Sequence, residues 1–428
     1  MSDDRITATY LIETAHPLQK AAEAMAGEQS SGTFVPVPGE TDELRARHGA
    51  AVTRITEFET VDSPSLPGSH PPKGSSGPLR YKRAEVVLSF PLENVGPSLP
   101  NLMSMVAGNL FELGQFSGLK LIDLQLPPAF AQAHPGPQFG IEGTRQLSGV
   151  YDRPLIGTII KPSVGLSPQE TAGLIGTLAG SGLDFVKDDE LIANPPYSPL
   201  KERVKAVMRV VNDQADRSGK KVMVAFNITD EIEAMYRHHD LVHEAGGTCI
   251  MVSLLSVGMA GVAALRKHSQ LPIHAHRNGW GIYNREPYLG ISYVAYQKFW
   301  RLIGVDHMHV NGLRNKFCEP DESVIASARE CLTPMFEGDS AKRGFCVMPV
   351  FSSGQWAGQA PDTYKALGSV DLMYLAGGGV MAHPAGPAAG ATSLRQAWEA
   401  AAQGVPLAEY ARSHPELRQA MEKYGSNE

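Results

Sequence analysis

The chain has 428 residues, of which 43% are hydrophobic and 19% charged, and its formal net charge is −7 at pH 7. This length is enough for two domains and a large core. The negative charge, without a long Lys or Arg run, argues against a nucleic-acid binder. Four cysteines without CxxC spacing are too few for a zinc site or a disulfide framework, which favours a reducing cytosol. No apolar run approaches the ~20 residues of a membrane span, and no signal-peptide core follows the polar start, so we expect a cytoplasmic protein.

Residues 1–145 mix strands and helices without strict alternation, which is typical of an α+β domain. Hydrophobic patterns predict strands at 6–12, 52–58, 84–90 and 119–126, and helices at 16–27 and 98–111. Residues 62–77 are dense in Pro, Ser and Gly and indicate an exposed loop, and the proline-rich stretch 127–140 indicates a linker.

From Pro154 onward, short apolar strands alternate with helices of roughly 10–20 residues. Strands are predicted at 155–160, 184–187, 222–227, 249–253, 273–276, 307–309, 345–351 and 372–376, with helices such as 167–179, 200–216, 231–245 and 322–331. Eight such units predict a (β/α)8 barrel over residues 146–428, after a first domain at 1–145. An open doubly wound sheet is the alternative, but no GxGxxG follows the first strand.

An unusual cluster, Lys187-Asp188-Asp189-Glu190, follows the second predicted barrel strand. Carboxylates there suit a hard cation such as magnesium, which prefers oxygen ligands. An ammonium would repel a cation, but a neutral amine that captures carbon dioxide becomes a carbamate, an anionic oxygen donor. Lys187, Asp189 and Glu190 would then form a three-oxygen site. The alternative is a salt-bridge cluster that closes the rim of the barrel.

Other chemically active side chains lie in or just after the remaining strands, at whose carboxyl ends the active sites of such barrels lie. They are Lys161, Asn227, His274 and His276 with Arg277, His307 and His309, Lys316, the stretch 352–354 and the glycines 377–379. Each has a structural alternative: the lysine can be solvated, the histidines can be core residues or ligands of a transition metal, and the glycines can form a tight turn. As a phosphate cradle, the glycines would offer unobstructed backbone N–H groups.

Several long stretches resemble the RuBisCO large-chain family. The stretch GLDFVKDDE at 182–190 resembles the activated-lysine signature of that family, and GTIIKPSVGLS at 157–167, HAHR at 274–277, DHMH at 306–309 and GGGVMAHP at 377–384 follow in the same order. EQSSGT at 28–33 and Gly108-Asn109 match in the first domain. The resemblance covers most of the chain and implies the barrel and an N-terminal α+β domain of ferredoxin-like type.

The resemblance also implies roles for individual residues. A carbamylated Lys187 would hold magnesium with Asp189 and Glu190, and Lys161 would be the base in enolisation. His276 and Lys316 fall at the positions of a catalytic histidine and a mobile-loop lysine. The substrate would be bound by Arg277, His309, Ser352, Gly354, Gly377 and Gly378, and by Glu28, Thr33 and Asn109 of a neighbouring subunit. The active site would therefore need a homodimer, or a multiple of dimers.

Departures from the carboxylase pattern concern the same site. The carboxylases have Thr-x-Lys-Pro-Lys at the first strand, whereas Ile159, Lys161 and Ser163 occupy the first, third and fifth positions here. Phe34 and Trp280 stand where the carboxylases have tryptophan and histidine. These changes predict a RuBisCO-like protein (form IV) that does not fix carbon dioxide.

The retained residues are suited to reactions through an enediolate. Our leading hypothesis is a carboxy-lyase that decarboxylates a phosphorylated keto sugar acid, and the resemblance implies 3-oxo-isoapionate 4-phosphate. The alternative is an enolase or isomerase of methionine salvage that acts on a methylthio-sugar phosphate, with Trp280, Ile159 and Phe34 lining a thioether pocket. A third hypothesis is a non-catalytic regulator on the same fold.

Overall fold

The computed structural model describes residues 4–32, 37–336 and 343–425. These residues form two compact units, one containing residues 4–32, 37–135, 280–302 and 335–336, the other containing residues 136–279, 303–334 and 343–425. The domain boundary between residues 145 and 146 stays a prediction. Of the helices in the described ranges, none combines the length and apolar character that crossing a bilayer requires.

The first unit is built on one five-stranded sheet with the order β10-β4-β1-β3-β2. Its elements are β1 (Arg5–Thr14), α1 (Leu18–Glu28), α2 (Asp42–His48), β2 (Ala51–Val61), β3 (Tyr81–Pro91), α3 (Leu99–Ala107), β4 (Gly118–Gln125), α4 (Ala129–Ala133), α10 (Gly281–Asn284), β10 (Leu289–Ile291) and α11 (Tyr293–Ile303). Strands β1 to β4 pair antiparallel, and β10 joins the edge in parallel with β4. This arrangement confirms the predicted α+β domain.

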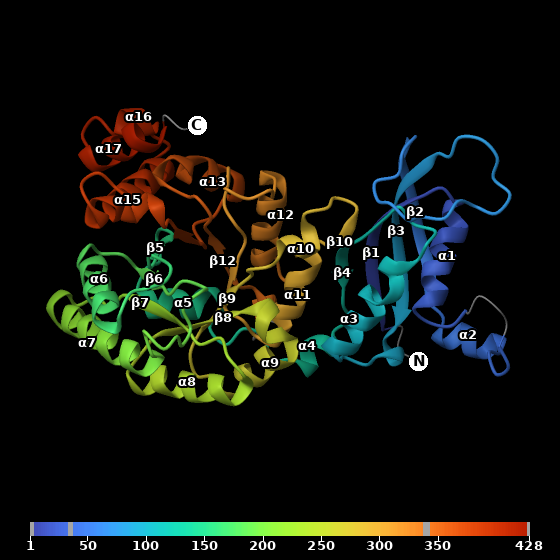
Figure 1. Cartoon of the computed structure of the whole chain (residues 1–428), viewed down its shortest axis with the longest axis horizontal. Coiled ribbons are helices and arrows are strands. Elements are labelled where there is room, and N and C mark those ends of the chain that lie inside the picture. The colour runs from blue at the N-terminus through green and yellow to red at the C-terminus, as the bar shows by residue number, and fades with distance from the viewer. Residues whose placement is uncertain (1–3, 33–36, 337–342, 426–428) are drawn as a thin grey trace. The chain divides into compact units, whose positions relative to one another are not determined.

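The second unit is a closed barrel of eight parallel strands, which confirms the predicted (β/α)8 fold. Its strands are β5 (Leu155–Ile159), β6 (Phe185–Lys187), β7 (Met223–Asn227), β8 (Cys249–Ser253), β9 (Ile273–His276), β11 (His307–His309), β12 (Met348–Phe351) and β13 (Met373–Leu375). Its helices are α5 (Gly140–Ser148), α6 (Pro168–Gly180), α7 (Leu200–Ser218), α8 (Ile232–Glu244), α9 (Leu254–His268), α12 (Asp321–Leu332), α13 (Ala360–Leu367), α14 (Gly378–Met381), α15 (Pro387–Gln403), α16 (Leu407–Tyr410) and α17 (Pro415–Tyr424). Helices α6 to α9 follow their strands around the outside of the barrel (Figure 1).

Local sequence accounts for where these elements begin and approach one another. Helix α6 begins with a capping box, in which the Ser167 hydroxyl accepts from the Glu170 N–H and the Glu170 carboxylate accepts from the Ser167 N–H. In β5, a side chain on Gly157 would place Cβ 2.5 Å from Leu375 and 2.6 Å from the Phe185 carbonyl oxygen. Glycine therefore lets three neighbouring strands close around a core that includes Leu155, Phe185 and Met251.

Of the predicted boundaries that differ from the structure, three illustrate why. Residues 127–140 are not only a linker, because α4 begins after Pro128 and α5 begins at Gly140. The predicted helix 98–111 ends at Ala107, and residues 109–112 form a 3-10 turn. Strand β12 begins at Met348 rather than at Phe345, which ends a short 3-10 turn and has a positive φ of 62°. A strand residue does not adopt that backbone conformation.

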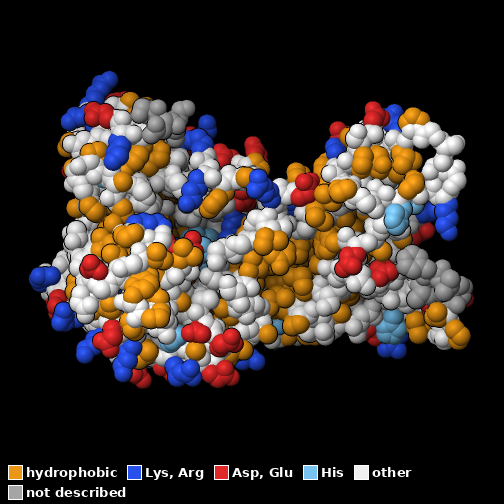
Figure 2. All heavy atoms as spheres, viewed as in Figure 1, with side chains coloured by type: hydrophobic (Ala, Val, Ile, Leu, Met, Phe, Trp, Pro, Cys, Tyr) orange, Lys and Arg blue, Asp and Glu red, His pale blue; other side chains and the backbone are white. Residues whose placement is uncertain are grey.

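Charged side chains are mixed over the barrel. On the face of the barrel that Figure 2 shows, Lys and Arg are interspersed with Asp and Glu. Such a mixture differs from the continuous basic surface that tracks a nucleic-acid backbone.

Candidate active site

The predicted barrel residues lie at the carboxyl ends of the strands, where the loops that form active sites of this fold begin. Lys187 is the last residue of β6, His276 ends β9 and His309 ends β11. Lys161 follows β5 and Ser352 follows β12. The parallel pairing of the eight strands therefore gathers residues from distant parts of the chain at one end of the barrel.

Lys187 is the most deeply placed of these residues, with 1% of its surface exposed. Its Nζ donates to the Asp188 carbonyl oxygen at 2.9 Å and lies 3.4 Å from the Glu190 carboxylate. Burial lowers the pKa of Lys187, although the charges of Glu190 and Asp189 oppose the shift. Burial therefore favours the neutral amine, which is the form that reacts with carbon dioxide.

Lys161 reaches the same cluster from the neighbouring strand. Its Nζ lies 2.6 Å from Oδ2 of Asp189 and donates to the Ser163 hydroxyl at 2.8 Å. Asp189 is buried, whereas 43% of the Lys161 side chain is exposed. The lysine thus presents its ammonium group at the rim of the site and holds it there by two polar contacts.

Asp188 has a different position from its two acidic neighbours. Its Oδ2 accepts from Arg203 at 3.1 Å and from the Asn227 N–H at 3.0 Å, and all three residues are buried. The Asn227 side chain donates to the carbonyl oxygens of Asp189 and Glu190 at 3.3 and 3.2 Å. Asp188, Arg203 and Asn227 therefore fix the backbone of the cluster, while Asp189 and Glu190 keep their carboxylates for the site.

Two histidines, His276 and His309, lie next to the acidic cluster. His276 Nε2 lies 3.4 Å from the Glu190 carboxylate, and its ring centroid is 4.5 Å from that of His309. Burial, together with the charge of Lys187, lowers the pKa of His276 to about 4. Burial would raise the pKa of Glu190, but the charges of Lys187 and His276 outweigh it and lower that pKa to about 2. At neutral pH, Glu190 is a carboxylate beside a neutral imidazole.

The glycine-rich turns lie beside Lys161 and Lys316. A Cβ on Gly377 would lie 3.9 Å from Cε of Lys161, and a Cβ on Gly354 would lie 3.5 Å from the backbone nitrogen of Lys316. Gly378 begins the short helix α14. The Lys316 side chain is exposed, with Nζ 5.2 Å from the centre of the Phe317 ring. At these turns the glycine backbone therefore lies next to Lys161 and Lys316.

Arg277 has a partner that the sequence did not indicate. Its guanidinium is ion-paired with the buried carboxylate of Glu319. The same carboxylate accepts from Asn311 Nδ2 at 2.6 Å and from the Ser323 hydroxyl at 2.9 Å. Glu319 offsets the charge that Arg277 would offer to a substrate anion.

The residues predicted in the first unit are also close to one another. Asn109 Nδ2 donates to Glu28 Oε1 at 3.2 Å, and both side chains are near the surface. Thr33 and Phe34 lie outside the described residues.

The donor set of the barrel site fits a carbamate-assisted magnesium site. Asp189 and Glu190 offer hard oxygen donors, and the side-chain nitrogens of Lys161 and Lys187 lie 2.6 and 3.4 Å from these two carboxylates. A carbamate on Lys187 would replace its neutral amine with two oxygen donors and leave a net negative site for a divalent cation.

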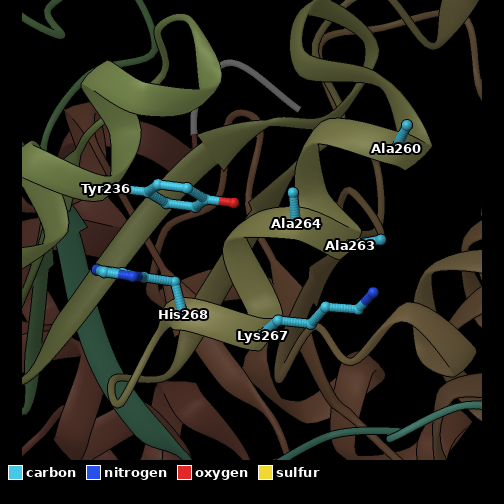
Figure 3. A pocket seen from close by; sticks show the side chains of 6 residues that line it. All are labelled: Tyr236, Ala260, Ala263, Ala264, Lys267 and His268. Carbon is cyan, nitrogen blue, oxygen red and sulfur yellow. The ribbon is translucent and has the colours of Figure 1, made fainter.

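A second group of ionisable side chains lies outside the barrel. A hollow of about 460 Å³ is lined by Tyr236 of α8 and by Ala260, Ala263, Ala264, Lys267 and His268 of α9 (Figure 3). Beside it, ligand atoms of His239, Asp240 and His268 lie within 4.8 Å of one another. However, His239 Nε2 accepts from the Gln270 N–H at 3.1 Å, so Nδ1 carries the proton and donates to Asp240 at 2.9 Å. That nitrogen has no lone pair for a metal, and the group instead ties α8 to the end of α9.

Profiles of known families match both parts of the chain. The RuBisCO large-chain catalytic domain matches residues 140–424, and the N-terminal domain of the same protein matches residues 1–130. The chain belongs to the RuBisCO large-chain family.

Relatives in this family whose names specify a reaction include the following two. A 3-oxo-isoapionate-4-phosphate transcarboxylase/hydrolase of Xanthobacter autotrophicus is 56% identical over 98% of this chain and 99% of its own. A 3-oxo-isoapionate-4-phosphate decarboxylase of Rhizobium etli is 48% identical over 98% of each chain. The prediction of a carboxy-lyase of the RuBisCO family agrees with these names.

Solved RuBisCO-like structures share the fold. A rubisco-like protein from Burkholderia fungorum has a TM-score of 0.90 and 48% identity, covering 99% of this chain and 100% of its own. A rubisco-like protein (MtnW) from Alicyclobacillus acidocaldarius has a TM-score of 0.82 and 28% identity, with the same coverage. The prediction of a RuBisCO-like protein is confirmed.

Proposed function

We propose that this protein acts on 3-oxo-isoapionate 4-phosphate and breaks the carbon–carbon bond to its carboxylate. The observation that carries the proposal is the buried Lys187 with Asp189 and Glu190, beside Lys161 and the glycine turn at Gly377. Two relatives at 56% and 48% identity have this compound in their names. A carboxylate β to a ketone leaves as carbon dioxide when the electron pair of the broken bond passes into an enediolate.

Different residues of this chain would bind the metal, transfer the proton and bind the phosphate. When bound, magnesium would supply electrostatic stabilisation of the enediolate oxygens, and Lys187 as a carbamate, Asp189 and Glu190 would hold it. Lys161, held by Asp189 and Ser163, would give and take the proton at the reacting carbon. The N–H groups around Gly354, Gly377 and Gly378 would bind the phosphate. His276, neutral beside Glu190, would bind a substrate oxygen, and Lys316 would reach the site from its exposed loop.

Two fates of the carbon dioxide follow from the same enediolate. Protonation of the enediolate after carbon dioxide leaves completes a decarboxylation. Addition of the carbon dioxide to the other enediolate carbon transfers the carboxyl group, and attack of water on the resulting ketone then splits the product. The higher identity to the transcarboxylase/hydrolase, 56% against 48%, favours the second fate.

The rival function is an enolase or isomerase reaction on a methylthio-sugar phosphate. Ile159 supports it, because this partly buried apolar side chain packs at the end of β5 beside Gly377. We rank this function second, because the chain is only 28% identical to the MtnW structure.

We further propose that the active form is a homodimer in which Glu28, Asn109 and Thr33 of one subunit complete the partner's site. The hydrogen bond between Asn109 and Glu28 supports this role, because it orients both side chains in advance. Arg277 and Ser352 would contact the substrate from the barrel side, and His309, whose ring nitrogens face His274 and Ser352, would support Ser352.

The test is a comparison of substrates in the presence of magnesium and bicarbonate, followed by phosphorus NMR. We expect 3-oxo-isoapionate 4-phosphate to be consumed and methylthio-sugar phosphates to remain. Consumption of only the methylthio-sugar phosphates would replace the proposed function with the rival one.

A further inference from the structure

A chain of buried hydrogen bonds runs through the barrel from α5 to the end of β12. Thr144 Oγ1 lies 2.8 Å from His307 Nε2, and His307 Nδ1 lies 3.3 Å from His274 Nδ1. His274 Nε2 lies 2.7 Å from His309 Nε2, and His309 Nδ1 lies 3.0 Å from the Ser352 hydroxyl. All five residues are buried. Both nitrogens of each of the three rings therefore belong to one continuous chain.

Each of these rings carries a single proton at neutral pH. Burial lowers the pKa of His307 to about 3 and the pKa values of His274 and His309 well below the usual value. In a neutral imidazole, one nitrogen donates and the other accepts. Once the direction of one hydrogen bond in the chain is known, the directions of all the others follow.

Thr144 fixes that direction. Its hydroxyl donates to the carbonyl oxygen of Gly140, one helical turn earlier, at an oxygen–oxygen distance of 2.5 Å. Without a proton between them, two oxygen acceptors at this distance would repel each other. The hydroxyl proton is thus committed to Gly140, and Thr144 can only accept from His307.

The remaining directions follow ring by ring. His307 carries its proton on Nε2, so its Nδ1 accepts from the Nδ1–H of His274. His274 Nε2 then accepts from the Nε2–H of His309, and His309 Nδ1 accepts from the Ser352 hydroxyl. The Ser352 proton is therefore directed at the ring of His309.

The neighbour of Ser352 does not change this assignment. The Ser353 hydroxyl donates to Asn311 Oδ1 at 2.9 Å and lies 3.5 Å from the Ser352 oxygen. The proton of Ser353 is thus committed to Asn311. The lone pairs of the Ser352 oxygen remain for a donor that enters at the carboxyl end of the barrel.

We propose that Thr144 is a positioning residue that, through His307, His274 and His309, makes Ser352 a hydrogen-bond acceptor for the substrate. This inference rests on the proposed function for the identity of the substrate, a polyhydroxylated keto acid phosphate. Ser352 then selects a hydroxyl group of the substrate at this position. An ionised oxygen of a phosphate or carboxylate would meet a lone pair there and be rejected.

The test reads the tautomers directly and requires no substrate. Histidine-selective ¹⁵N labelling and long-range ¹H–¹⁵N correlation spectra of the full-length enzyme distinguish Nδ1–H from Nε2–H rings. We expect Nε2–H for His307, Nδ1–H for His274 and Nε2–H for His309. The opposite tautomer at any of the three rings would overturn the inference, whatever the activity of the enzyme.

Two variants test the role of Thr144. Thr144→Ser keeps the hydroxyl and should keep the tautomers, KM and kcat. Thr144→Val removes it, and we expect mixed tautomers and a KM for 3-oxo-isoapionate 4-phosphate that is raised about tenfold, with a smaller change in kcat. Unchanged tautomers in Thr144→Val would overturn the inference. If Thr144→Val does not fold, the spectra of the unmodified enzyme and of Thr144→Ser still show whether the three histidines have the expected tautomers.

A failure of the proposed function would look different. The tautomers would be as expected, but 3-oxo-isoapionate 4-phosphate would not be consumed by the unmodified enzyme.

Discussion

Lys161 and Asp189 form an ion pair between neighbouring strand ends, with 2.6 Å between Nζ and Oδ2. The Nζ atom of Lys187 likewise lies 3.4 Å from Oε2 of Glu190. The two carboxylates proposed to hold magnesium thus each contact the side-chain nitrogen of a lysine. A bound cation would compete with both lysines, so metal binding should change the position of the proposed proton-transfer group.

Removal of magnesium by EDTA should abolish turnover, and added magnesium should restore it. We expect Asp189→Asn and Glu190→Gln each to weaken magnesium binding about 100-fold or more, because ligands matter at least as much as their supporting residues. Glu202→Gln, at an exposed position of α7, serves as the control. Calorimetric titration with magnesium measures the affinities. Full activity in EDTA would contradict the metal-dependent mechanism.

Lys187→Ala should remove both the carbamate and the activity. The buried amine is the proposed site of carbon dioxide addition, and the alanine variant has no group that can replace it. With ¹³C-bicarbonate, a carbamate resonance is expected in the unmodified enzyme and in the exposed-lysine control Lys205→Ala, but not in Lys187→Ala. Retention of full activity by Lys187→Ala would exclude the carbamate role.

Arg203→Met should destabilise the protein by about 3–5 kcal/mol, because it leaves the buried Asp188 carboxylate without its charged partner. Both side chains are almost fully buried, at 0% and 1% exposure. Arg217→Met, at an exposed position near the end of α7, should change stability by less than about 0.5 kcal/mol. Urea denaturation of both variants measures the difference. Equal effects would show that the Asp188–Arg203 pair contributes no special stability.

Acid should destabilise the barrel partly through His307. Its pKa falls from 6.5 to about 3 on folding, because the buried ring resists protonation. The unfolded chain therefore binds an additional proton below about pH 6.5, and the free energy of unfolding declines toward pH 3. A single such group contributes up to about 1.4 kcal/mol per pH unit. His307→Asn should reduce the slope of a plot of unfolding free energy against pH; an unchanged slope would contradict the shifted pKa.

The sequence predicted the barrel well because each strand is a short, mostly apolar segment with a polar or glycine residue at its end or within the next two positions. Strand β8 matches its predicted bounds, and β9 and β11 do as well. The misplaced start of β12 shows the limit of this approach. The apolar residues before Met348 continue the hydrophobic pattern, but the positive φ at Phe345 depends on backbone conformation that hydrophobicity does not report.

The candidate site, too, could be predicted only in part from the sequence. Lys187, Asp189 and Glu190 could be chosen because a lysine among carboxylates is unusual at a strand end. The partners of Asp188 and Arg277 could not be, because Arg203 lies on a helix 15 residues away and Glu319 lies 42 residues away. Thr144 was missed for the same reason, since nothing in its local sequence connects it with His307, 163 residues later.

The most direct test of the proposed function follows the carboxyl carbon of the substrate. 3-Oxo-isoapionate 4-phosphate labelled with ¹³C at its carboxylate is incubated with magnesium, bicarbonate and either the unmodified enzyme or Lys187→Ala. We predict that carbon NMR shows the label leaving its original carbon with the unmodified enzyme and staying there with Lys187→Ala. A label that stays in place with the unmodified enzyme, or that leaves equally with both proteins, would contradict the proposed function.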